Sequence, residues 1–132
     1  MADKTQLAML KDSVSVWNVW RAAHTDTQPD LAEAHLHGLD LIGANLGNAN
    51  LRKADLRGTN LSDASLVGAH LEGATFFKAI LNRADLAGAF LIGAQFLTSD
   101  QLVAARNWQS AYRDLNLGCG APIPTADHKP PQ

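Results

Sequence analysis

The chain has 132 residues, 46% of them hydrophobic and 18% charged, which is enough for one domain whose core needs neither disulfides nor a metal. Its 11 basic and 13 acidic side chains leave a formal charge of -2, which excludes a strong electrostatic field toward nucleic acid or a membrane surface. The single cysteine, Cys119, excludes an internal disulfide framework and a cysteine metal pair.

Residues 1–28 are predicted to form a helical cap and a lead-in segment. Their apolar residues recur at the spacing of one stripe of an amphipathic helix. The members of this stripe are Leu7, Leu10, Val14 and Trp17, widened by Trp20. Lys11 and Asp12 interrupt the apolar run, so the segment is not typical of a secretory leader, and no stretch approaches the roughly 20 apolar residues of a membrane span. We therefore expect a cytoplasmic protein with no membrane partner.

Residues 29–98 repeat with a period of five. Leucine or phenylalanine stands at the centre of fourteen consecutive units, usually with alanine two residues before it. The centres are Leu31, Leu36, Leu41, Leu46, Leu51, Leu56, Leu61, Leu66, Leu71, Phe76, Leu81, Leu86, Leu91 and Phe96. In a helix every fifth residue is turned by about 140°, and in a strand it lies on the opposite face, so neither element buries all the centres. The chain must turn a corner about once per unit, and this predicts a solenoid whose coils pair with the coils above and below.

The units ANLGN (44–48), ADLRG (54–58) and ADLAG (84–88) fit the pattern A(D/N)LxG, and the segment resembles the pentapeptide-repeat proteins. The resemblance implies an all-β solenoid, a right-handed quadrilateral β-helix of about 3.5 coils with four units per coil and the centres facing inward. With twenty residues per coil, Phe76 and Phe96 fall above one another, and we expect their rings to stack.

Aspartate or asparagine directly precedes half of the centres. These residues are Asp30, Asp40, Asn45, Asn50, Asp55, Asn60 and Asp85. We expect their side chains to accept hydrogen bonds from neighbouring backbone groups at the corners. Glycine often follows a centre by two residues, where a tight corner favours a residue without Cβ.

A solenoid exposes an apolar cross-section at each end unless it is capped. We expect the helix of residues 1–28 to cover the first coil. At the other end, Thr98 and Gln101 form a capping-box pattern that predicts a helical cap over residues 99–118. The predicted cap residues are Trp17, Trp20, Trp108 and Tyr112. Residues 119–132, rich in proline, are predicted to be a disordered tail.

The histidines of the repeats give no catalytic or metal site. His35 and His37 flank the inward Leu36 and should face solvent, whereas His70 belongs to a different side of the square. They cannot converge on one metal. We predict a protein that is not an enzyme and binds no cofactor.

Five apolar residues occupy outward positions near the end of the repeats and form a candidate patch. They are Phe77, Ile80, Phe90, Ile92 and Leu97. Phe77 and Leu97 are twenty apart and are predicted to form one outward column with His37 and Arg57. Because an apolar patch usually marks something that covers it, either the C-terminal helix folds over these residues or a second subunit or partner protein does.

The prediction is a non-catalytic scaffold that binds an unidentified protein, either as a monomer or as a homodimer through its C-terminal end. The resemblance offers one alternative, because some family members protect bacterial DNA gyrase as rods that imitate duplex DNA. Residues 29–98 hold seven acids against five bases, and 3.5 coils make a rod of only about 17 Å. Since duplex DNA carries a charge about every 1.7 Å, this alternative is the less favoured one.

Overall fold

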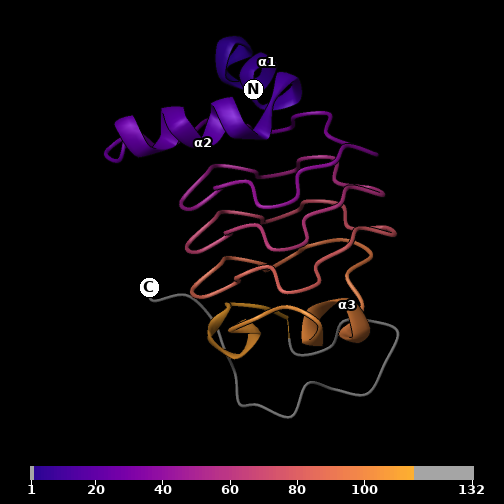
Figure 1. Cartoon of the computed structure of the whole chain (residues 1–132). Helices are drawn as coiled ribbons and strands as arrows, with labels where there is room; N and C mark the ends of the chain where they lie inside the picture. The colour runs from indigo at the N-terminus through magenta and orange to yellow at the C-terminus, as the bar shows by residue number, and fades with distance from the viewer. Residues whose placement is uncertain (1, 115–132) are drawn as a thin grey trace.

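Backbone hydrogen bonds between residues twenty positions apart define the fold. The computed structural model describes residues 2–114, so the predicted tail of residues 119–132 and the last residues of the 99–118 segment lie outside it. Ten parallel bridges join residues twenty apart, from Asp30 with Asn50 to Thr75 with Gln95. Four bridge positions recur in every coil, and the coils lie one above another (Figure 1). The stack is therefore four-sided. We number its sides by the first bridge residue of each: side 1 at Asp30, side 2 at His35, side 3 at Asp40 and side 4 at Asn45.

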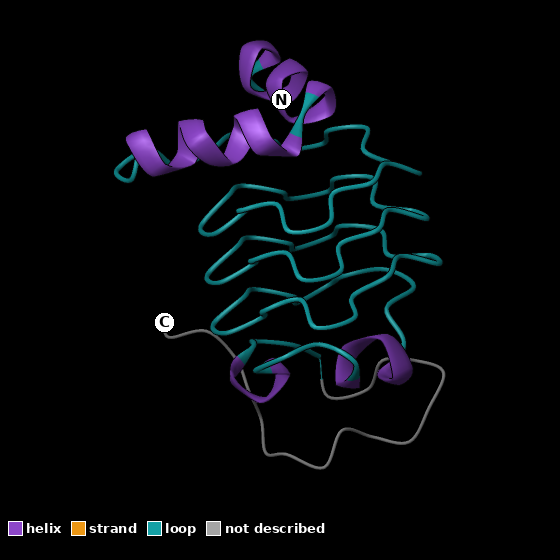
Figure 2. Cartoon of the chain, in the orientation of Figure 1, coloured by secondary structure: helices purple, strands orange, loops and turns teal. Residues whose placement is uncertain are grey.

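The straight part of each side is only one residue long. In the described part of the chain every bridge is isolated, and Figure 2 draws the coils without strands. The second residue after each of the first thirteen centres has a left-handed φ, from Glu33 to Gly93. This residue turns the chain before a longer strand can form, so the predicted all-β solenoid consists of bridges and corners.

The aspartates and asparagines before the centres hold the corners, and this prediction is confirmed for all seven. Each side-chain Oδ1 accepts a hydrogen bond from the backbone N–H two residues later, as in Arg57 N to Asp55 Oδ1 at 3.1 Å. Such local side-chain bonds favour a turn over a continued strand.

The core is a ladder of inward centres with alanines between them. Thirteen of the fourteen predicted centres, Leu31 to Leu91 in steps of five, are buried. Phe96 is the exception, and its prediction was wrong: its side chain is 66% exposed and Leu97 is buried in its place. Phe96 has a left-handed φ of 58°, which in the preceding units occurs only at the second residue after a centre, because the chain leaves the coil here to begin a helix at Ser99. Phe96 therefore does not stack on Phe76.

Two short helices lie over the first coil (Figure 1). Helix α1 spans Lys4–Asp12, and its first backbone N–H groups are capped by the side chain of Asp3. Helix α2 spans Val14–Ala23, and Ser13 both ends α1 and caps α2 by accepting a hydrogen bond from Val16 N. Side-chain caps of this kind satisfy the free N–H groups of a helix start. Within residues 2–114, no helix is long and apolar enough to cross a membrane.

The inner face of α2 bonds to the edge of the first coil. Trp17 is buried, and its Nε1 donates to the Asn45 backbone oxygen at 2.7 Å. Arg21 Nη2 donates to the Gly47 backbone oxygen at 2.6 Å. These side chains replace the donors that a preceding coil would have supplied on side 4.

The opposite end is closed by α3 (Ser99–Val103) and a 3-10 turn, η1 (Trp108–Ser110), with the predicted capping box present at the start of α3. Gln101 Nε2 donates to the backbone oxygens of Phe76 and Ala79 at 2.8 and 2.9 Å. The Phe76 oxygen also accepts from Ala79 N at 2.9 Å, whereas the Ala79 oxygen faces the place of the next coil and has no other donor within residues 2–114, so Gln101 satisfies an acceptor that would otherwise lack a partner.

The helical cap predicted over residues 99–118 is helical, in its described part, only at α3 and η1. The segment after α3 completes the coil instead. Arg106 bridges to Asp85 on side 4, and Tyr112 bridges to Phe90 on side 1. Apolar side chains of this segment extend the core, namely Leu102, Ala105 and Ala111, with the half-buried Trp108 packed against them.

Replacing Gln101 with alanine should lower the free energy of unfolding by about 2 kcal/mol, because the Ala79 oxygen loses its donor and the Phe76 oxygen loses one of its two. Urea unfolding measures the change. Gln95→Ala is the control, since this exposed side chain makes no hydrogen bond with residues 2–114. Equal losses in both variants would contradict the capping role of Gln101.

Candidate interaction surfaces

The predicted apolar patch is not one surface. Phe77 lies on side 2 and is 48% exposed, Ile80 is exposed on side 3, and Phe90 and Ile92 are half-buried on side 1. Leu97 points into the core, so its assignment to an outward column with Phe77 was wrong. The change of register at the end of the repeats moved it inward.

The C-terminal segment covers side 1 of this region. The Tyr112 ring stacks on Phe90 with 5.0 Å between centroids, and Phe90 stacks on His70 at 4.5 Å. On side 2, Phe77 meets Phe96 edge-on at 5.8 Å, and both rings stay exposed. The internal cover that the sequence suggested therefore applies to side 1 and not to side 2.

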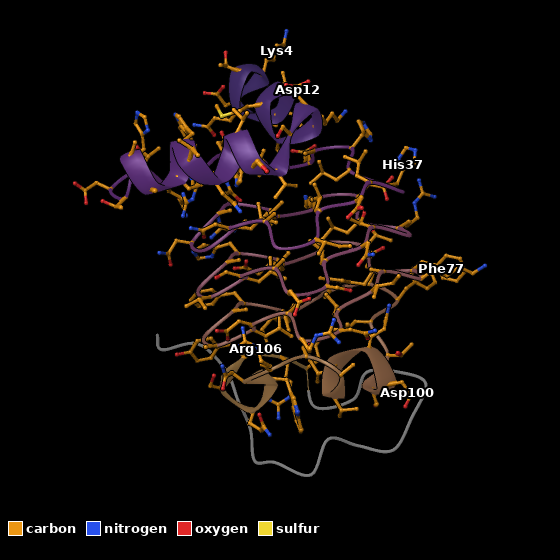
Figure 3. All side chains as sticks on the ribbon, viewed as in Figure 1. Lys4, Asp12, His37, Phe77, Asp100 and Arg106 are labelled. Carbon is orange, nitrogen blue, oxygen red and sulfur yellow. The ribbon has the colours of Figure 1, made fainter. Side chains whose placement is uncertain are left out.

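Side 2 carries a shallow recess of about 400 Å³. It is lined by His37, Gly38, Arg57, Gly58, Phe77 and Lys78. Figure 3 shows His37 and Phe77 projecting from the same edge of the coil stack. The residues come from three successive coils, since 37, 57 and 77 differ by twenty. The fold thus stacks an imidazole, a guanidinium and a phenyl ring in one column.

Asp55 holds the cation of this column in place. Arg57 Nε and Nη2 donate to the two Asp55 oxygens at 2.8 and 2.7 Å. This side-chain hydrogen bond is the main reason that the pKa of Asp55 falls to about 2; burial acts in the opposite direction. The Arg57 side chain is 57% exposed and that of Asp55 only 17%, so the pair presents its cationic partner to solvent.

The other walls also carry ion pairs between acids and arginines. Arg83 Nε pairs with Asp63 at 2.9 Å, and Arg52 Nε lies 3.6 Å from a Glu72 oxygen. Among residues 2–114 no three histidine, cysteine or carboxylate side chains are grouped so that they could hold a metal ion.

The outer face of α2 forms a second surface, which we call the α2 face. Val16, Val19, Trp20 and Ala23 are spaced i, i+3, i+4 and i+7, and Val19 is 72% exposed. With Met9, Ser15 and His24 they line an apolar groove of about 520 Å³. Sequence reasoning placed Trp20 in the cap, and in the structure its ring lies beside Trp17 and stacks on His24 at 4.9 Å. The spacing of the α2 face is present in the sequence. Sequence analysis found only the stripe through Trp17, because α2 is apolar on two faces.

Comparison with known families identifies the repeats. Residues 30–66 and 54–91 match the family model of pentapeptide repeats, in 8 copies. The chain belongs to the pentapeptide-repeat family. The resemblance to this family implied a right-handed quadrilateral β-helix, and the coils of the described residues are four-sided. No curated protein matches the chain.

Solved structures of other pentapeptide-repeat proteins are similar to the chain. A protein from the Arabidopsis thaliana thylakoid lumen is 25% identical over 65% of this chain and 64% of its own, with a TM-score of 0.44. Rfr23 from the cyanobacterium Cyanothece 51142 is 31% identical over 64% of this chain and 56% of its own, with a TM-score of 0.33. HetL from Nostoc sp. strain PCC 7120, involved in heterocyst differentiation regulation, is 28% identical over 70% and 47%, with a TM-score of 0.31. The chain thus spans less than two thirds of the length of each of these three proteins.

The low pKa of Asp55 predicts an acid-sensitive contribution to the stability of this pentapeptide-repeat stack. A carboxyl whose pKa is lowered by folding stabilises the protein above its unfolded pKa of about 4 and loses this effect as the pH falls toward 2. Asp55→Asn should therefore cost about 1 kcal/mol near neutral pH, a value reduced by the exposure of Arg57, and the difference should shrink below pH of about 4. Unfolding curves at several pH values measure it.

Asn retains the corner hydrogen bond of Asp55, so the comparison isolates the charge. Asp26→Asn, at an exposed carboxylate with no ion pair in the described part of the chain, serves as the control. A difference between the wild type and Asp55→Asn that stays constant down to acid pH would refute the role of the pair.

Proposed function

We propose that this pentapeptide-repeat protein is a non-catalytic scaffold that binds another protein through the α2 face. The main support for this proposal is the apolar groove along Val16, Val19 and Trp20. It lies on a helix whose other face is hydrogen-bonded to the first coil. Surfaces of this kind, apolar and rimmed by polar residues, commonly serve as protein contacts.

The spacing of the groove residues favours a helix as the occupant. Positions i, i+3, i+4 and i+7 form one stripe, into which the side chains of a second helix can pack. No residue that lines the groove is an acid, lysine or arginine, so the partner helix should bring an uncharged apolar face. Charges in the partner belong at the rim of the contact.

The size of the α2 face favours a different protein over a second copy. The helix has ten residues, a length of about 15 Å, and two such helices bury far less than the roughly 800 Å² per partner of a stable dimer. A longer partner helix that also contacts Met9 of α1 would bury more. A homodimer through the C-terminal end, the cytoplasmic location and the absence of a cofactor remain predictions.

The gyrase-type alternative has less support. A DNA mimic needs a continuous anionic surface. Here the acids of three walls are paired with arginines, as in Asp55 with Arg57, Asp63 with Arg83, and Glu72 with Arg52.

The test is calorimetric titration of the full chain with a designed amphipathic helical peptide whose apolar residues recur at i, i+3, i+4 and i+7. Val19→Asp should weaken binding by about tenfold or more, because the charge must be desolvated in the groove. Since Val19 is exposed, its replacement should shift stability by no more than about 0.5 kcal/mol.

Ala22→Asp is the matched control, because it adds the same charge to an exposed position of α2 outside the groove. Equal affinity for the peptide in both variants would exclude the α2 face as the site. Light scattering on the full chain tests whether a second copy occupies the α2 face. A dimer that dissociates in the Val19→Asp variant would show that the occupant is another molecule of this chain.

A further inference from the structure

We propose that the recess on side 2 is a second binding site, separate from the α2 face, and that it takes an acidic peptide segment carrying an aromatic residue. The site consists of the glycine floor at Gly38 and Gly58, the cations Arg57 and Lys78, and the exposed ring of Phe77.

The recess exists because two glycines stack at its corner. Both have a left-handed φ, of 70° and 66°, and a Cβ added at Gly38 would meet nothing within 4 Å. The same corner is closed by a side chain two coils along, at Lys78. The floor is therefore bare backbone, open to an incoming chain, with side chains only at its margins.

The charge of the recess fits an acidic ligand. Arg57 uses Nε and Nη2 for Asp55, and Nη1 makes no hydrogen bond within the described residues. Lys78 makes no ion pair in that part of the chain, and its Nζ lies 5.4 Å from the centre of the Phe77 ring. With Asp55 largely covered by its partner, two cations face outward against one shielded carboxylate.

Phe77 lies beside the Lys78 cation, and a second exposed ring, Phe96, contacts Phe77. Phe77 and Phe96 meet edge-on, an arrangement that leaves ring faces free for a third aromatic group. Phe96 also has a left-handed φ of 58°, which bulky residues rarely adopt. Strained backbone of this kind often marks a functional position, and here it holds a ring in solvent at the edge of the recess.

A peptide fits this surface better than a nucleic acid. Two outward cations can pair with one or two carboxylates, whereas a nucleic-acid strand presents a row of phosphates that a longer basic groove must follow.

The test measures the fluorescence anisotropy of a labelled peptide of alternating Glu and Phe in the presence of the full chain. The wild-type chain should bind it with micromolar affinity, and binding should weaken with added salt. A peptide with Ala in place of Phe, and one with Lys in place of Glu, should each bind at least about tenfold more weakly.

Matched variants locate the site. Gly38→Asn fills the floor with a residue that this chain already accommodates at the same position of a unit, in Asn48 with φ 58°. Gly43→Asn makes the same change at the next corner, where a Cβ also meets nothing within 4 Å. We expect Gly38→Asn to reduce affinity by about tenfold and Gly43→Asn to leave it unchanged.

The charge and the ring have their own controls. Lys78→Glu should abolish binding, whereas Lys53→Glu, at an exposed position with the same backbone conformation on another corner, should not. Phe96→Asn should weaken binding without lowering the melting temperature, because Asn tolerates the left-handed conformation better than Phe. A merely structural Phe96 would instead lower the melting temperature.

Three results would overturn the proposal. These are no measurable binding of the Glu/Phe peptide by the wild-type chain, equal loss of affinity in Gly38→Asn and Gly43→Asn, and tighter binding of a labelled single-stranded oligonucleotide than of the peptide. The last result would assign the recess to nucleic acid. Variants of the α2 face should not change the affinity of this peptide, so failure at either site is distinguishable from failure at the other.

Discussion

Each coil is held by an exchange of backbone hydrogen bonds with the coil twenty residues away. Leu31 N donates to Asn50 O, Asn50 N donates to Pro29 O, and the same exchange recurs through the repeats. The exchange requires a corner in every unit, and the corner requires a left-handed residue two positions after each centre. Inward positions are then confined to one large and one small apolar side chain. Outward side chains carry none of these constraints, so both candidate surfaces could form on the walls and the cap without cost to the stack.

The two ends of the rod are closed by the same physical means. A terminal coil leaves backbone donors and acceptors without a neighbouring coil, and buried groups of this kind must be satisfied. At the first coil Trp17 and Arg21 donate to carbonyl oxygens that face the missing coil, and at the last coil Gln101 donates to the Ala79 oxygen. Each cap therefore imitates part of a missing coil with side chains, while its helix shields the apolar cross-section.

The five-residue period and the family resemblance predicted the four-sided stack, the buried centres up to Leu91 and the corner role of the aspartates and asparagines. Those features depend on local pattern and on a fixed repeat. Phe96 is exposed and Leu97 is buried, the reverse of the prediction, because the register changes where α3 begins. A repeating sequence pattern does not show at which residue the repeat ends. The recess on side 2 was partly visible as the column through His37, Arg57 and Phe77. Its open floor could also have been inferred, because Gly38 and Gly58 are corner glycines twenty residues apart. Its charge depends on the covering of Asp55 by Arg57, which the sequence alone does not determine.

The twenty-residue coil also makes the rod a spacer of stepwise length between the two proposed binding surfaces. Deleting or adding a whole coil would change the distance between the α2 face and the recess by about 4.8 Å and keep their relative direction. Adding a single unit of five residues would instead turn everything beyond it by a quarter revolution. Length and angle between two bound partners could therefore be adjusted in separate steps, by insertions that leave every inward position occupied by the same kind of residue.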